Sequence, residues 1–221
     1  MGMPSPRRPR IRWTRADSLL LQGTLFLVLL LLTLSFGATV LWILPVISVG
    51  AMEWMNQITV HHTSEVARAV PDLTLLSEDV SVRGTDTLVL VFENPDTLER
   101  LLLALPALAQ QTLGLFVVYL VLRVLQSLGT GDPFVPANVR RVYAVAFAVL
   151  FGSLLLPMVE SIANTALWAD RVPFDEVALL AFDLGMGSGP VAGVLVGLLL
   201  ASLAEVFRRG ARMREDVEGL V

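Results

Sequence analysis

The stretch LLLQGTLFLVLLLLTLSFGATVLWILPVISVGAM, residues 19–52, is the longest apolar run of the chain and decides its fold class. A helix of about 20 apolar residues crosses the roughly 30 Å hydrocarbon core of a bilayer, so this run is long enough to cross and then emerge. The apolar core of a cleaved signal peptide has only about 7–15 residues, so we expect an uncleaved anchor. Pro45 lacks a backbone donor, and we expect the chain to bend there.

Three further apolar runs follow, and the composition agrees with a membrane protein. Hydrophobic residues make up 55% of the chain and charged residues 16%, whereas soluble domains carry about 45–50% and about 25%. The absence of cysteine excludes disulfides, thiolate metal sites and cysteine nucleophiles. The sequence therefore predicts an all-α membrane protein with four transmembrane helices and a small extracytoplasmic cap between the first and second. The further runs are Leu101–Leu122, Val142–Val159 and Pro190–Phe207, the last extended by Leu184–Gly189.

The arginines are sorted along the chain, which predicts the orientation of the spans. All 16 bases are arginine, and twelve of them lie before the first span, between the second and third, and after the fourth. Short arginine-rich loops stay in the cytoplasm, so we expect a multi-pass membrane protein with both termini cytoplasmic. The segment 51–100, expected outside, carries nine acids against three arginines.

The segment between the first two spans is expected to form the cap. Apolar residues with rough helical spacing indicate that the first helix continues through Ala51–Val70. Two β-prone runs flank a glycine-containing turn and predict a hairpin over residues 79–92. Asp96 or Thr97 can cap the helix that enters the second span. Because the cap is small, we expect it to pack on the membrane helices.

These assignments divide the chain into alternating spans and loops. In the second outer loop, residues 177–184 are left open between a strand and a short helix. The expected layout is a basic cytoplasmic N-terminus (1–18), transmembrane helix 1 (19–48), the cap (49–100), helix 2 (101–123), a cytoplasmic turn (124–139), helix 3 (140–160), an outer loop (161–184), helix 4 (185–207) and a cytoplasmic tail (208–221).

Few polar side chains lie within the predicted spans. Gln110 and Gln111 lie inside the second span, and we expect interhelical hydrogen bonds there. Glu205 lies at the end of the fourth span and is expected to pair with Arg208 or Arg209. No ionisable residue lies at the centre of any span, whereas ion-coupled transporters usually place one at that depth, which counts against a transporter.

No pattern indicates catalysis or a bound metal. His61 and Glu65 have the i, i+4 spacing of two metal ligands, but a structural zinc site usually needs four, and the only other histidine is His62. Adjacent residues on a helix point about 100° apart, so the two histidines are poorly placed to bind one ion. No HExxH, GxSxG or P-loop pattern is present. We expect no enzyme activity and no catalytic, cofactor-binding or metal-binding residue.

Small residues recur at every fourth position of the last span. Such a series lets another helix approach closely, because packing rather than a hydrophobic driving force associates helices in lipid. The spacing predicts that another helix packs closely on this stripe. It does not say whether that helix belongs to the same chain or to a second copy in a homo-oligomer formed through helix 4. The stripe runs through Gly185, Gly189, Gly193, Gly197 and Ala201, and the predicted packing positions are Gly189, Gly193, Gly197 and Ala201.

Two stretches on the expected cytoplasmic side are more specific than composition: GDPFVPANVRR at 131–141 and LAEVFRRGARMREDVE at 203–218. The first begins with a glycine- and proline-containing turn, after which Pro136 can start the next helix, and the second continues the fourth span as a helix. Both resemble the DUF2975 family of bacterial membrane proteins, with Met213 where that family usually has leucine. The resemblance implies the four-helix layout and no established activity. It also suggests a partner, because members are often encoded beside a small helix-turn-helix regulator of the Cro/C1 type.

With the bacterial setting that the resemblance implies, we expect a multi-pass protein of the bacterial inner membrane that is a regulatory or scaffolding component and acts through its cytoplasmic turn and C-terminal helix. Its expected partners are the lipid bilayer and such a regulator, without direct nucleic-acid binding. The alternative is a small permease or accessory subunit of a membrane transport system, although the loop 123–141 is short for coupling to an ATPase. Arginine near anionic lipid is stabilising without a protein partner, so plain anchoring also stays open for both stretches. The predicted docking residues are Asp132, Phe134, Asn138, Phe207, Arg208 and Arg212.

Overall fold

The computed structural model describes residues 15–61, 87–128, 136–169 and 189–218, and nearly all of this part of the chain is helical. Each of its four long helices contains an apolar stretch of 25 to 32 residues, enough to cross a membrane. The prediction of an all-α membrane protein with four spans is confirmed. The helices are α1 (Arg15–Ile43), α2 (Thr97–Leu128), α3 (Pro136–Trp168) and α4 (Gly189–Glu218).

The helices begin and end at signals present in the sequence. α1 ends at Ile43, just before Pro45, which cannot continue the hydrogen-bonded ladder. α2 begins with a capping box: the backbone N–H of Glu99 donates to Asp96 Oδ1 (2.7 Å), and the N–H of Asp96 donates to Glu99 Oε2 (2.8 Å). α3 begins at Pro136. The predictions made at Pro45, Asp96 and Pro136 are confirmed.

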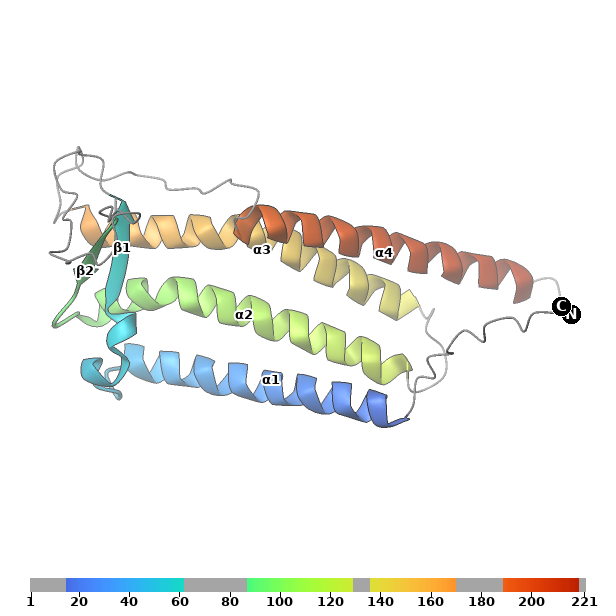
Figure 1. The fold of residues 1–221 in the computed structure, drawn as a ribbon, viewed down its shortest axis with the longest axis horizontal. Helices are drawn as coiled ribbons and strands as arrows, with labels where there is room; N and C mark the ends of the chain where they lie inside the picture. The colour runs from blue at the N-terminus through green and yellow to red at the C-terminus, as the bar shows by residue number, and fades with distance from the viewer. Residues whose placement is uncertain (1–14, 62–86, 129–135, 170–188, 219–221) are drawn as a thin grey trace, which may run out of the picture.

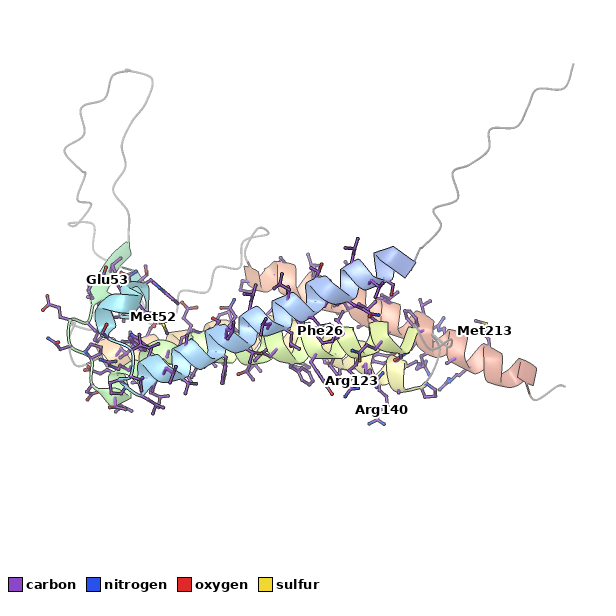
Figure 2. All side chains as sticks on the ribbon, turned by 90° about the horizontal axis from the view of Figure 1, so that it is seen from below. Phe26, Met52, Glu53, Arg123, Arg140 and Met213 are labelled. Atoms are coloured by element: carbon purple, nitrogen blue, oxygen red, sulfur yellow. The ribbon has the colours of Figure 1, made fainter. Side chains whose placement is uncertain are left out.

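The helices stand in chain order, each packed against the next along the sequence. Figure 1 shows this row from α1 at one edge, through α2 and α3, to α4 at the other. In the perpendicular view of Figure 2 the four helices overlap in one band, so they form an open row rather than a closed bundle. The outer helices therefore expose large apolar side chains such as Leu20 (71% exposed) and Leu199 (70%), as expected of surfaces that lipid covers.

Close approach between α3 and α4 occurs at glycines. A Cβ built on Gly197 would lie 2.7 Å from Leu150 Cβ and 2.9 Å from the Leu150 Cα and N, all on α3. A Cβ on Gly193 would collide with the Cβ of Ser153, also on α3. Only glycine allows the two backbones to come this near. The helix that packs on the glycine stripe is therefore α3 of the same chain.

The predicted packing positions of the stripe differ in their surroundings. A second copy of the chain has no room at Gly193 and Gly197, because α3 occupies that face. A Cβ on Gly189 would meet none of the described atoms within 4 Å, since a cavity separates the first turn of α4 from Pro157 of α3. Ala201 is half-buried, and Gly185 lies outside the described residues. Association of two copies through another face of α4 stays a prediction.

α4 is shifted along α3 towards the end of the row where the α2–α3 turn lies. By the register between the two antiparallel helices, Pro136 is level with about residue 211, so the last two turns of α4 extend roughly 10 Å further at ~1.5 Å per residue. Figure 1 shows α4 projecting past the ends of α2 and α3. The contacts that define this register are Gly193–Ser153, Gly197–Leu150 and Glu205–Tyr143.

A small cap joins α1 to α2. It consists of a 3₁₀ segment, η1 (Val49–Met55), and two antiparallel strands, β1 (Gln57–His61) and β2 (Thr87–Val91). The expected strand before Phe92 is present as β2, but its described partner is β1, where we expected the first helix to continue. The rest of the expected hairpin, residues 79–86, and the open segment at 177–184 lie outside the described residues.

Burial on one face explains why β1 is a strand. Ile58 is buried in a cluster with Phe92 and with Leu167 of α3, whereas its neighbours Gln57 and Thr59 are exposed. This alternation has the period of a strand, and β-branched residues favour one. The prediction of a helix through these residues is therefore wrong, because contact with α3 selects one face of an extended segment. The expectation that the cap packs on the membrane helices is confirmed.

Arg100, in the first turn of α2, links that helix to the end of α1. Its Nη1 donates to the carbonyl oxygens of Trp42 (2.9 Å) and Ile47 (3.4 Å), and its Nε donates to that of Pro95 (3.2 Å). Its guanidinium carbon lies 5.3 Å from the centroid of the Trp42 ring, in a cation–π contact. Carbonyls at the C-terminal end of a helix have no partner within the helix, so Arg100 satisfies one that α1 leaves open.

Candidate functional site

The candidate site lies at the right-hand end of the row in Figure 1, where α2 ends, α3 begins and α4 projects. This end carries the described parts of the two sequence stretches that we singled out, residues 136–141 and 203–218. The end holds two hydrogen-bonded clusters, one between α2 and α3 and the other between α3 and α4.

The first cluster is centred on Asn138, which is only 1% exposed. Its Oδ1 accepts hydrogen bonds from Ser127 Oγ of α2 (2.8 Å) and from Arg141 Nη1 of α3 (3.0 Å). The same Arg141 nitrogen lies 3.4 Å from the carbonyl oxygen of Arg123 on α2. An amide oxygen has two lone pairs, so one buried acceptor serves both donors. Asn138 therefore positions the start of α3 against the end of α2.

The second cluster is centred on Glu205 of α4. Its Oε2 accepts from the Tyr143 hydroxyl of α3 (2.8 Å) and from Arg208 Nε (2.6 Å). Its Oε1 accepts from Arg209 Nε (3.0 Å) and is also paired with Arg208 Nη2, which completes a bidentate ion pair. The prediction that Glu205 pairs with Arg208 or Arg209 is confirmed. The hydroxyl of Tyr143 adds a link between helices that the sequence analysis missed.

Beyond this cluster, one side of α4 is exposed and mixes charge with apolar surface. Val206, Arg209 and Met213 follow one another at i, i+3 and i+7 and so share one face. The side chain of Arg209 is 74% exposed and Met213 is 64% exposed. Arg212, next to Arg209 on the helix surface, is exposed as well. These four residues, Val206, Arg209, Arg212 and Met213, are called the α4 tip below.

The six predicted docking residues fall into different environments. Asn138 is buried and used within the fold, which removes it from any docking surface. Phe207 is half-buried, and Arg208 is half-buried and paired with Glu205. Arg212 is exposed on the α4 tip. The other two, Asp132 and Phe134, lie outside the described residues.

The amides of the second span differ in their use. Gln111 Nε2 donates to Ser35 Oγ (2.9 Å) and to Thr39 Oγ1 (3.2 Å), both on α1, so the predicted interhelical hydrogen bond is confirmed there. Gln110 is exposed instead. With Glu160 of α3 it lines two cavities, of about 380 and 350 Å³, towards the cap end of the row. Polar side chains from two helices thus meet at that end.

The histidines that we considered as metal ligands do not lie on a helix together. His61 is the last residue of strand β1, whereas His62 and Glu65 lie outside the described residues. In the part of the chain that the structure describes, no group of three or more histidine, aspartate or glutamate side chains could bind a metal ion. No chemistry of a bound metal can therefore be derived from the described residues.

Comparison with known proteins identifies a family for this chain. The family model described as a protein of unknown function, DUF2975, matches residues 68–221, which is more than half of the chain. The match includes α2, α3 and α4 and both stretches from which we inferred the resemblance. No curated protein matches the chain. No solved structure matches it either.

Proposed function

This chain belongs to the DUF2975 family of proteins of unknown function, and on that premise we propose that it is a regulatory or scaffolding membrane protein rather than an enzyme. It resides in a bacterial inner membrane with both termini in the cytoplasm. The arginine distribution supports this orientation, because Arg123, Arg140 and Arg212 all lie at the end of the row where the two stretches lie. The partner binds at this end.

The exposed α4 tip is the observation that carries the proposal. It leads into the last two turns of α4, which project past α2 and α3, and two arginines stand beside the apolar side chains of Val206 and Met213. Arginine and methionine are enriched in protein interfaces, where a guanidinium binds carboxylates and a flexible thioether fills apolar gaps. The partner is therefore a small cytoplasmic protein with acidic groups around an apolar groove. The helix-turn-helix regulator suggested by the family resemblance is the first candidate.

The orientation can be tested directly, because the natural chain contains no cysteine and single-cysteine variants need no other change. We expect Thr59→Cys, on the cap, to react with an impermeant maleimide on intact spheroplasts. Ala137→Cys and Met213→Cys, both at exposed positions, are expected to react only after permeabilisation. Labelling of Met213→Cys from outside, with Thr59→Cys protected, would reverse the proposed orientation.

The docking role can be tested at the α4 tip without disturbing the Glu205 cluster. We expect Arg212→Lys combined with Met213→Ala to reduce recovery of the co-expressed helix-turn-helix regulator about tenfold, since it removes the planar guanidinium and the apolar contact. The measurement is the amount of regulator co-purified per unit of membrane-inserted protein. Leu199→Ala, on the lipid-facing part of α4, serves as control and should recover as much regulator as the natural chain. Unchanged recovery with the α4 tip variant would contradict docking there.

A transport role is the second candidate, and the paired cavities at the cap end favour it. Gln110 and Glu160 line both cavities, so a polar ligand entering between α2 and α3 would meet an amide and a carboxylate. A permease subunit of this kind needs an energy source. Stoichiometric co-purification of an ATPase, in place of the regulator, would select transport.

A further inference from the structure

A groove between α2 and α3 at the arginine-bearing end is separate from the α4 tip. It is a cavity of about 340 Å³ lined by Leu120 of α2 and by Ala137, Arg140, Arg141 and Ala144 of α3. Two arginines thus line the same groove as the apolar residues Leu120 and Ala144. None of the described residues that line it is acidic.

The two arginines of the groove have donors to spare. Arg140 is exposed and makes no hydrogen bond or ion pair with the described residues. Arg141 uses Nη1 in its bonds to Asn138 and to the Arg123 carbonyl, while its Nη2 and Nε make no hydrogen bond with the described residues and can bind a ligand. Because Asn138 is buried and hydrogen-bonded to Ser127 as well, it orients the Arg141 guanidinium in advance.

A third cation stands beside the groove. Arg123 of α2 stacks over the Tyr119 ring, with 5.3 Å between its guanidinium carbon and the ring centroid, and its Nε donates to the Tyr119 hydroxyl (3.0 Å). Figure 2 shows the side chains of Arg123 and Arg140 projecting from the same side of the helix row. Glu205, the acid of the neighbouring α3–α4 cluster, is already paired with Arg208 and Arg209. The groove therefore concentrates positive charge without a described counter-ion.

We propose that this groove binds one anionic phospholipid, with the phosphate on Arg140 and Arg141 and an acyl chain along Leu120 and Ala144. A guanidinium binds phosphate oxygens through two parallel hydrogen bonds, which makes arginine suited to this ligand. The apolar part of the groove, at the point where an apolar span meets a cluster of arginines, favours a lipid over free phosphate. A zwitterionic lipid would bring an ammonium group towards three arginines and be disfavoured.

The proposal can be tested by native mass spectrometry of the full chain in detergent, titrated with phosphatidylglycerol, with phosphatidylethanolamine or with inorganic phosphate. We expect one phosphatidylglycerol to bind per chain, about tenfold more tightly than phosphatidylethanolamine. The reason is that only phosphatidylglycerol carries a net negative charge, which balances the positive charge of the arginines. Excess inorganic phosphate should not displace it. Displacement by an equal concentration of inorganic phosphate would overturn the lipid assignment.

Matched variants separate this groove from the general positive charge of that end. The Arg140 side chain makes no hydrogen bond or ion pair with the described residues, so its replacement should not disturb the fold. The variant Arg140→Gln should bind phosphatidylglycerol about tenfold more weakly, as expected when a charge-assisted hydrogen bond is lost. Arg140→Gln combined with Arg141→Gln should bind more weakly still. Arg212→Gln, with the same loss of charge on the α4 tip, should bind like the natural chain. Equal weakening by Arg212→Gln, or none by Arg140→Gln, would overturn the proposal.

Discussion

Replacing Gly197 by leucine is expected to lower the free energy of unfolding by about 3 kcal/mol, at the upper end of the usual cost of overpacking. The new Cβ would lie 2.9 Å from the backbone of Leu150, which cannot rotate away as the tip of a side chain can. α4 would have to move off α3, and the contact at Gly193 would open with it. Unfolding of the purified protein in detergent, followed by tryptophan fluorescence and checked by size-exclusion chromatography, measures the loss.

Gly189→Leu is the matched control for this prediction. It is the same substitution on the same helix, but at a position where an added Cβ meets no atom of the described residues within 4 Å. We expect its free energy of unfolding to stay within about 0.5 kcal/mol of the natural value. If Gly189→Leu and Gly197→Leu unfold alike, the register of α4 on α3 is not the one described above.

Asn138→Ala is expected to lower the free energy of unfolding by about 2 kcal/mol, because it removes two hydrogen bonds at one buried acceptor, each worth about 1 kcal/mol. Ser127 Oγ keeps the carbonyl oxygen of Val124 (2.7 Å) and Arg141 Nη1 that of Arg123 (3.4 Å), so neither donor is left without an acceptor. The donors affected are Ser127 Oγ on α2 and Arg141 Nη1 on α3. Since they lie on different helices, the joint between α2 and α3 should loosen. The same unfolding experiment in detergent measures the effect.

The neighbouring exposed residue Ala137 supplies the control, and Ala137→Ser should change the free energy of unfolding by less than about 0.5 kcal/mol. This comparison also decides what Asn138 is for. A docking residue could be replaced without loss of stability and would affect only partner recovery. Natural stability of Asn138→Ala together with loss of the partner would therefore overturn the structural role assigned to Asn138.

Several parts of the site could be predicted because their partners are close in sequence or are common to all membrane helices. Glu205 reaches Arg208 and Arg209 at i, i+3 and i+4, which the sequence displays directly. Gln111 was expected to hydrogen-bond to another helix, because an amide side chain without a hydrogen-bond partner in lipid has a high free energy. Neither prediction required knowledge of how the helices are ordered.

Other residues were misjudged because their partners are far away along the chain. Asn138 was taken for a docking residue because it lies in one of the two stretches that resemble the family, and the sequence does not reveal that Ser127 approaches from α2. Arg100 was counted only as a charge, although its bonds to Trp42 and Ile47 link two helices. A signal was available for Arg100, because a single arginine at the start of a span is well placed to bind the open carbonyls of the preceding helix.

The sequence by itself determined the four membrane spans and the positions at which three of their helices begin or end. It also determined that most of the arginines lie in the segments expected on one side of the membrane. These are local properties: apolar length is matched to the bilayer, and caps and prolines act within one turn. The tertiary structure alone decided the open order of the row, the shift of α4, the strand at 57–61 and which glycines are in contact. Each of these depends on which two surfaces meet. Because lipid solvates every apolar helix face about equally well, burial of apolar surface does not select which faces pack together. Close fit between helix backbones and a few polar contacts determine the pairing instead.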